Sequence, residues 1–169
     1  MIPASIDLLI LDVDGVLTDG RLTPLPDGEA SKAFYVQDGV ALKLWQRCGG
    51  QAAILSGRSE TATLRRAAEL GIECVRTGVS DKTTAYRELL ASLGFGDAAV
   101  AYVGDDLPDL GPMAHCAFPV AVADAVPAVK RAAAYVTRRC GGTGAVAEVV
   151  ELLLRKRNQW CRGAGPKTS

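Results

Sequence analysis

Short apolar runs alternate along this chain with longer segments whose apolar positions repeat at helical spacing. Five runs predict buried strands, and the AAYV run is a candidate sixth: residues 6–11, 52–55, 73–76, 99–103, 116–120 and 133–136. Helices are predicted at residues 38–49, 59–71, 80–94 and from about Thr143 onward, the first two with Asp38 and Ser59 as N-caps. Such alternation predicts an α/β fold, a doubly wound, mostly parallel, Rossmann-like sheet with helices on both faces.

Residues 20–36 interrupt this alternation. Two short extended runs flank the sequence PDG at residues 26–28, where Pro presets φ and Gly supplies a positive φ. The segment is therefore predicted to be a β-hairpin inserted after the first strand. We expect residues 1–155 to form a single domain and the basic residues 156–169 to form a flexible tail.

Composition narrows the possible functions. The 169 residues carry 19 basic and 19 acidic side chains, so a zero net charge provides no general reason to bind nucleic acid or a membrane surface. The 5 cysteines form no C-x-x-C pair and predict neither a disulfide framework nor a zinc site. The first residues lack the basic region of a signal peptide. These features predict a cytoplasmic protein.

Chemically distinctive residues follow the first four predicted strands. Asp12 and Asp14 end the first strand, Ser56 follows the second, and Lys82 opens the helix after the third. The fourth strand is followed by the acidic residues Asp105, Asp106 and Asp109. Ligands of parallel sheets bind at the carboxyl ends of the strands, so we expect these side chains to meet at one edge.

This set of residues suits phosphoryl transfer. Facing carboxylates repel unless a cation lies between them, and the hard oxygens of Asp12, Asp14 and Asp105 favour Mg²⁺. One carboxylate, such as Asp12, can attack phosphorus, while a second can protonate the leaving oxygen and later deprotonate water. Lys82 and the Ser56 hydroxyl can bind the equatorial phosphoryl oxygens.

The order of these motifs resembles that of the haloacid dehalogenase-like phosphatases, over residues 8–109. A finer resemblance is to the capless branch that acts on sugar-acid phosphates, through the hairpin and the sequences DVDGVLTDGRL, F-x-V-x-DG, LSGR, GVSDK, YVGDDLPDL and GGTGAVAEV. The resemblance implies a Mg²⁺-dependent phosphomonoesterase with 3-deoxy-D-manno-octulosonate 8-phosphate as the expected substrate. Its product would enter cell-envelope lipopolysaccharide synthesis.

The same resemblance assigns roles to the residues. Asp12 is the expected nucleophile, which forms a phosphoaspartate, and Asp14 the general acid/base. Magnesium would be bound by Asp12, Asp105 and the backbone carbonyl of Asp14, with support from Asp106 and Asp109. Phosphate would be bound by Ser56 and Lys82. Candidate substrate contacts are Arg58, Gly57, Asp38 and Thr18; Arg58 is chosen because a guanidinium pairs bidentately with a carboxylate.

The motif spacing predicts that no cap domain is present. The gaps of 41 residues between Asp14 and Ser56 and of 22 between Lys82 and Asp105 are filled by predicted elements. Further units below about 40 residues rarely fold unaided. A capless site is open to water, whereas water exclusion strengthens its electrostatics. The hairpin and the C-terminal segment of neighbouring subunits are therefore the expected cover, and the resemblance implies a homotetramer.

Three positions depart from the family pattern and keep alternatives open. Ala147 and Lys43 stand where Arg is usual, and Asp81 stands where Asn is usual. One alternative is a phosphatase for another sugar phosphate, such as a nine-carbon ulosonate 9-phosphate. An alternative from a different class is a receiver-like domain, which has its phosphorylated Asp on strand three. In this chain the third strand ends in VRTGVSD, and the D-x-D pair follows the first strand instead. An inactive interaction module is the last alternative.

Overall fold

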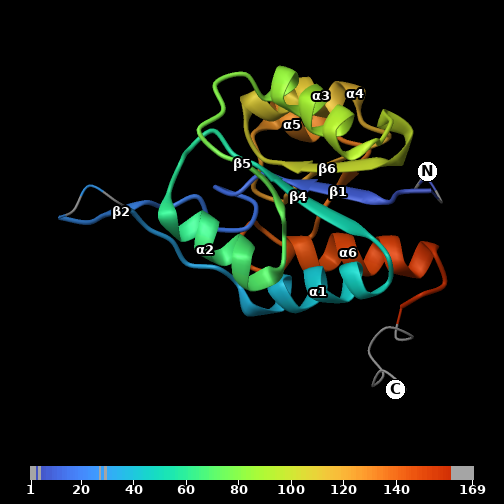
Figure 1. Ribbon diagram of the computed structural model, residues 1–169, viewed down its shortest axis with the longest axis horizontal. Helices are drawn as coiled ribbons and strands as arrows, with labels where there is room; N and C mark the ends of the chain where they lie inside the picture. Colours follow the sequence, from blue (N-terminus) through green and yellow to red (C-terminus); the bar gives the residue numbers. More distant parts are fainter. Residues whose placement is uncertain (1–2, 4, 27, 29, 161–169) are drawn as a thin grey trace.

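The computed structural model describes residues 3, 5–26, 28 and 30–160. Its centre is a six-stranded sheet with the strand order β5-β4-β1-β6-β7-β8, in which every pair is parallel (Figure 1). The strands are β1 (Leu8–Leu11), β4 (Gln51–Leu55), β5 (Cys74–Arg76), β6 (Val100–Gly104), β7 (Phe118–Ala121) and β8 (Tyr135–Val136). All six predicted strands, the candidate sixth included, are therefore confirmed.

Strand β1 lies in the middle of the sheet, between β4 and β6. All of its residues are buried, because both faces of a parallel sheet are covered by helices. Its last residue, Leu11, pairs with Ile54 of β4 and Val103 of β6. The backbone N–H of the next residue, Asp12, still donates to the Val103 carbonyl at 3.1 Å. The chain after β1 therefore emerges beside the ends of both neighbouring strands.

Helices cover both faces of the sheet, as the doubly wound fold requires. They are α1 (Val36–Arg47), α2 (Thr61–Leu70), α3 (Lys82–Leu93), α4 (Leu110–His115), α5 (Pro127–Ala132) and α6 (Ala145–Lys156), with 3₁₀ turns η1 (Asp97–Ala99) and η2 (Leu107–Asp109). Helices α3, α4 and α5 lie on one face, and α1, α2 and α6 lie on the other (Figure 1). Helices α4 and α5 are too short to show a helical repeat in the sequence, and they were not predicted.

Two predicted helix starts are wrong. The N-cap of α1 is Tyr35, so Asp38 lies in the first turn, where it is buried. The N-cap of α2 is Glu60 rather than Ser59. For Asp38 the error arises because its carboxylate accepts a hydrogen bond from the distant Ala147 backbone, a tertiary contact that local sequence does not reveal. For α3, the Asp81 carboxylate accepts from the backbone of Thr83 and Thr84.

The predicted hairpin consists of β2 (Thr23–Pro24) and β3 (Ala30–Ser31), which pair antiparallel. It projects sideways from the layered domain (Figure 1). Gly28 has a φ of 85°, the left-handed conformation expected at this turn, while positions 27 and 29 lie outside the described residues. The fold therefore has the expected hairpin insertion, and no cap domain is present among the described residues.

The last described residues pack against the domain. After α6, the Arg157 guanidinium lies 4.3 Å from the centre of the Trp45 ring and contacts the Ile6 carbonyl and Asp7. Residues 161–169 of the predicted tail lie outside the described part of the chain, so the domain boundary near residue 155 stays a prediction. Within the described residues, none of the helices combines the length and apolarity needed to cross a bilayer.

Candidate active site

The predicted functional side chains meet at the carboxyl edge of the sheet, around a pocket of about 320 Å³. Its lining includes eight of the residues expected from the motifs: Asp12, Asp14, Ser56, Gly57, Arg58, Lys82, Asp105 and Asp106. They come from the ends of β1, β4 and β6 and from the start of α3. Parallel strand direction thus gathers residues that are up to 94 positions apart in the sequence onto one edge.

Lys82 links two carboxylates at the floor of this pocket. Its Nζ lies 2.9 Å from Asp12 Oδ2 and 2.8 Å from Asp109 Oδ1, and all three side chains are buried. Burial works to lower the pKa of Lys82, but the two carboxylates outweigh this effect and raise its pKa above the usual value. The side chain is therefore held as an ammonium group beside Asp12.

Asp109 uses both of its oxygens within the protein. Oδ1 accepts from Lys82 and from the Tyr102 hydroxyl at 2.8 Å each. Oδ2 accepts from the backbone N–H groups of Asp105 at 2.9 Å and Asp106 at 3.2 Å. Asp109 also closes a capping box with Asp106 at η2. This side chain therefore fixes the loop that carries Asp105 and has no oxygen left without a partner.

Asp12 and Asp105, in contrast, are poorly compensated. Burial, and then the neighbouring Asp109, raise the pKa of Asp12 to about 6. Burial, and then Asp12 and Asp109, raise the pKa of Asp105 to about 8. Asp105 Oδ1 is buried without a hydrogen-bond partner among the described residues. One carboxylate oxygen from each of Asp12, Asp105 and Asp109 lies within 4.8 Å of the others.

These features fit a divalent cation with hard oxygen ligands. A cation between Asp12 and Asp105 would relieve their repulsion and provide the partner that Asp105 Oδ1 lacks. Gly15 leaves room for the Asp105 carboxylate at this site. It has a φ of 86°, and any Cβ there would overlap that carboxylate. Because Asp109 is already saturated, the available carboxylates are those of Asp12 and Asp105.

The structure adds two residues that the sequence analysis missed, Lys32 and Glu60. Lys32 Nζ lies 2.7 Å from Asp14 Oδ1 and 2.5 Å from Glu60 Oε2, and its side chain is fully buried. Glu60 also pairs with the Arg58 Nε at 2.9 Å. Burial works to raise the pKa of Glu60, but the two cations outweigh it and lower that pKa. No local signal could have found Lys32, which in the sequence resembles a solvated hairpin lysine.

Ser56 and Arg58 lie on the loop after β4. Ser56 is buried, and its hydroxyl accepts from the Arg58 backbone N–H at 3.4 Å. The Arg58 side chain is half exposed at the pocket rim, with Glu60 as its ion-pair partner. Arg58 is thus anchored at Nε by Glu60, and it forms part of the lining of the pocket.

Thr18 and Asp38, two candidate substrate contacts, do not line this pocket. The Thr18 hydroxyl donates to the Val13 carbonyl at 3.3 Å and accepts from the Gly20 backbone at 3.2 Å. Asp38 Oδ1 accepts from the Ala147 backbone at 2.7 Å, at the start of α6. Burial raises the pKa of Asp38 to about 6, despite that hydrogen bond. Both make structural contacts, and their roles in substrate binding stay predictions.

The glycine-rich loop before α6 packs on the loop after β1. The Gly142 N–H donates to the Val16 carbonyl at 3.0 Å, and the Gly141 N–H donates to Asp124 at 2.9 Å. A Cβ at Gly141 would overlap the Gly15 carbonyl oxygen. These glycines therefore let two backbones approach closely and hold the Asp12–Asp14 loop in place.

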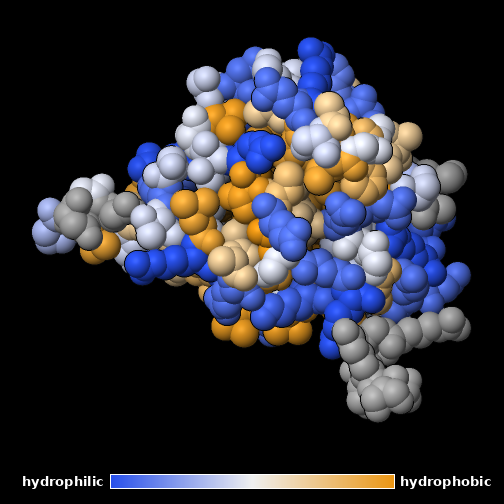
Figure 2. Space-filling view, in the orientation of Figure 1, coloured by the Kyte–Doolittle hydropathy of each residue, from blue (hydrophilic) through white to orange (hydrophobic). Residues whose placement is uncertain are grey.

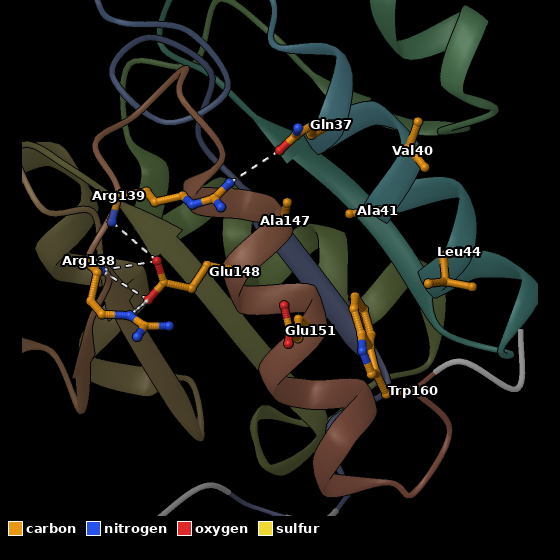
Figure 3. A pocket seen from close by; sticks show the side chains of 10 residues that line it. All are labelled: Gln37, Val40, Ala41, Leu44, Arg138, Arg139, Ala147, Glu148, Glu151 and Trp160. Carbon is orange, nitrogen blue, oxygen red and sulfur yellow. Dashed lines mark hydrogen bonds and ion pairs between the residues drawn. The ribbon is translucent and has the colours of Figure 1, made fainter. Parts of the chain in front are cut away.

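A second, larger pocket of about 560 Å³ lies between α1 and α6 (Figure 3). It contains Ala147 but none of the predicted catalytic or phosphate-binding residues. Its charges are paired: Glu148 lies 3.5 Å from Arg138 Nε and accepts from the Tyr135 hydroxyl at 2.7 Å. Size alone therefore does not identify the candidate active site.

Comparisons with known proteins agree with this geometry. Residues 71–150 match the profile of the haloacid dehalogenase-like hydrolase family. The chain is 47% identical over 151 residues to 3-deoxy-D-manno-octulosonate 8-phosphate phosphatase of Yersinia pestis, covering 89% of this chain and 81% of that protein. It is 46% identical to the enzyme of the same name from Escherichia coli K12, over 89% and 80% of the two chains. A crystal structure of the Moraxella catarrhalis phosphatase, in complex with magnesium ion, phosphate ion and KDO, superposes with a TM-score of 0.90. Sequence identity to that structure is 41%, with 93% of this chain and 91% of the other covered.

Proposed function

This chain belongs to the haloacid dehalogenase-like hydrolases and, within them, to the relatives of 3-deoxy-D-manno-octulosonate 8-phosphate phosphatase, and we propose that it is a Mg²⁺-dependent phosphatase of that sugar-acid phosphate. The observation that carries the proposal is the meeting of Asp12, Asp14, Ser56, Lys82 and Asp105 around one pocket. Carboxylates, a cation and a hydroxyl at one site match the requirements of phosphoryl transfer.

Asp12 is proposed as the nucleophile. Its carboxylate attacks phosphorus, the bond from phosphorus to the sugar oxygen breaks, and a phosphoaspartate forms. Lys82, at 2.9 Å from Asp12 Oδ2, supports this role because an ammonium group orients the attacking carboxylate and can bind a phosphoryl oxygen. The Ser56 hydroxyl would bind a second phosphoryl oxygen.

Asp14 is proposed as the general acid and base. In its protonated form it transfers a proton to the leaving sugar oxygen. It then takes a proton from water, whose oxygen attacks phosphorus, so that inorganic phosphate leaves and Asp12 is restored as a carboxylate. The position of Asp14 in the lining of the pocket, 21% of its side chain exposed, supports contact with both partners.

Asp12, Asp105 and the backbone carbonyl of Asp14 would bind Mg²⁺. The chemistry that this ion supplies when bound is neutralisation of the carboxylates and of the phosphoryl oxygens. Asp106 and Asp109 would support the site, since Asp109 accepts from the Asp105 and Asp106 backbone. The raised pKa values of Asp12 and Asp105, about 6 and about 8, support the need for a cation there.

The substrate is proposed to be 3-deoxy-D-manno-octulosonate 8-phosphate, with Arg58 at the pocket rim as a candidate partner of the sugar carboxylate. The alternative, a nine-carbon ulosonate 9-phosphate, is kept because Ala147 replaces the usual Arg. The test is kcat/KM of the purified protein with Mg²⁺ on both ulosonate phosphates and on p-nitrophenyl phosphate.

We expect the eight-carbon substrate to have the highest kcat/KM. A higher value for the nine-carbon ester would favour the alternative substrate. No turnover of any ester would favour an inactive interaction module, and a phosphoryl group that persists on the protein would favour a receiver-like domain. A kcat/KM for the eight-carbon ester no higher than that for p-nitrophenyl phosphate would contradict the proposed substrate.

A closed symmetric oligomer, by the family resemblance a homotetramer, is proposed to cover the open site. Support comes from exposed apolar side chains on the hairpin and at the start of α1: Leu22, Leu25, Tyr35, Val36 and Val40. Figure 2 shows hydrophobic surface at the hairpin and along the α1 side of the molecule. The hairpin and the C-terminal residues 156–169 are the proposed contacts. A fully active monomer in sedimentation at micromolar concentration would contradict this assembly.

The reaction is proposed to take place in the cytoplasm and to release a free sugar acid for lipopolysaccharide synthesis. The four cysteines that the structure describes, Cys48, Cys74, Cys116 and Cys140, are free thiols, as is usual in a reducing compartment.

A further inference from the structure

The hairpin places a cation on the proposed general acid/base of its own chain. Lys32 follows β3 directly, and its Nζ lies 2.7 Å from Asp14 Oδ1. Lysine is almost never fully buried unless it is paired, and this side chain is fully buried even though the hairpin projects from the domain. The contact therefore fixes one particular atom of Asp14 in relation to the hairpin.

A second group holds Lys32 in this position. Glu60 Oε2 lies 2.5 Å from Nζ, and the Thr63 hydroxyl lies 3.5 Å away on the same side. Glu60 is itself buried and is fixed by the Arg58 Nε at 2.9 Å. The start of α2 thus anchors the lysine from one side, and Asp14 is the group on the other side.

We propose that Lys32 is a positioning residue for Asp14 and that Glu60 holds Lys32 in place. With the ammonium group against Oδ1, Oδ2 is the oxygen left to carry the proton. In the first half-reaction, the proton passes from Oδ2 to the leaving sugar oxygen as the bond from that oxygen to phosphorus breaks. In the second, Oδ2 takes a proton from the attacking water as the bond from Asp12 to phosphorus breaks. This inference rests on the proposed phosphatase function.

The inference gives the hairpin a second task besides subunit contact. A capless phosphatase lacks a separate domain that could carry residues to the general acid. Here an ion pair between Lys32, which follows β3, and Asp14, in the loop after β1, provides that link within one chain. Displacement of the hairpin would withdraw the cation from Asp14 but would leave Asp12, Lys82 and Asp105 unchanged.

The test compares two leaving groups in the Lys32→Met variant. A sugar alkoxide needs a proton from the general acid, whereas p-nitrophenolate leaves readily without one. A positioned general acid contributes about 10²- to 10⁴-fold. We therefore expect the rate of leaving-group release in the first turnover, at saturating substrate, to fall at least about tenfold for the sugar-acid phosphate and by less than about threefold for p-nitrophenyl phosphate. The first turnover is measured because the later hydrolysis of the phosphoaspartate is common to both substrates. Lys32→Arg should restore part of the ratio between the rates on the sugar-acid phosphate and on p-nitrophenyl phosphate, because it returns a cation to the same place.

A second variant tests the same inference in case Lys32→Met does not fold. Glu60→Gln keeps the shape of the side chain and should shift the ratio of the two first-turnover rates in the same direction by a smaller factor. Lys130→Met, the same substitution on α5, should leave the ratio unchanged. Equal losses of the first-turnover rate on both substrates in Lys32→Met and Glu60→Gln, or no loss in either, would overturn the inference. Absence of turnover in the wild-type protein would instead overturn the proposed function.

Discussion

Two pockets of this molecule differ in how their charges are compensated. At the carboxyl edge of the sheet, Asp105 Oδ1 is buried without a hydrogen-bond partner among the described residues, and Asp12 shares one lysine with Asp109. Between α1 and α6, Glu148 receives a hydrogen bond from the Tyr135 hydroxyl. It also receives hydrogen bonds from the Arg138 and Arg139 backbone (Figure 3). The smaller of these two pockets is therefore the one that requires a ligand, whereas the charged side chains that line the larger one already have partners within the protein.

This difference teaches that electrostatic compensation identifies a site better than volume does. Each unpaired buried carboxylate costs several kcal/mol of stability. A folded chain therefore retains buried like charges where they serve a function such as ligand binding. Among the residues that line these two pockets, the uncompensated charges lie where phosphate chemistry is proposed. The following substitutions test whether the contrast between the two pockets is real.

The largest effect is expected from Asp12→Asn. Loss of the nucleophile should lower kcat by at least about 10⁴-fold, in the range found when a nucleophile is removed from other enzymes. The metal-free variant should also melt at a higher temperature than the wild type, because a repelling charge is gone. Glu148→Gln in the larger pocket should do the reverse: kcat is retained and about 1–3 kcal/mol of stability is lost. Wild-type turnover by Asp12→Asn would contradict the nucleophile assignment.

Removal of metal is expected to have the next largest effect. EDTA should stop turnover, and Mg²⁺ should restore it. At about 100 times the dissociation constant, Mg²⁺ should stabilise the fold by about 2.7 kcal/mol, which corresponds to about 5–10 °C in the melting temperature. Asp105→Asn should remove this rise, whereas Glu151→Gln in the larger pocket should keep it. An equal rise in Asp105→Asn and wild type would place the ion elsewhere.

The loop that joins the two regions offers a third test. In Gly141→Ala the new Cβ would overlap the Gly15 carbonyl, so the loop that carries Asp12 must shift. We expect a loss of about 1–3 kcal/mol in the free energy of unfolding and a lower kcat. Gly96→Ala, where a Cβ meets no atom within 4 Å, is the matched control for chemical denaturation and activity. Similar behaviour of the two variants would show that the glycine loop does not position the site.

Asp38 is the poorly compensated carboxylate next to the larger pocket, and its effect should depend on pH. Its folded-state pKa of about 6 lies above the ordinary value of 3.8, so the folded state binds the proton more tightly. Its contribution to stability is therefore greatest below pH 4 and is lost as pH rises to about 6, by up to about 3 kcal/mol. Asp38→Asn should exceed the wild type in stability at pH 7.5, with the difference shrinking at pH 4.5. A constant difference in thermal melts across this range would contradict the raised pKa.

The smallest effect is expected from Ala147→Arg, which introduces a charge into the larger pocket. If this surface meets a substrate carboxylate in a neighbouring subunit, KM for the sugar-acid phosphate should fall by less than about tenfold. The kcat value, and KM for p-nitrophenyl phosphate, should not change. An unchanged KM for both substrates would show that the departure from the family pattern at this position is neutral.

The amino-acid sequence by itself determined the architecture and the core of the site. Apolar runs are local signals, and they located all six strands of the sheet to within a few residues. In a parallel sheet, all strands end at the same edge, so Asp12, Ser56 and Asp105 could be placed together before any contact was known. The short helices α4 and α5 escaped prediction because six residues are too few to show a helical repeat.

Only the tertiary structure decided the contacts that join distant segments outside this edge. Lys32 meets Glu60 because the hairpin folds back on the start of α2. Asp38 accepts a hydrogen bond from the backbone of Ala147 in α6, 109 residues away, and does not act as the N-cap of its own helix. Such contacts depend on how layers pack and on the direction in which an inserted hairpin leaves the domain. Sequence periodicity reports which face of an element is buried, but it does not specify which distant side chain will lie against it.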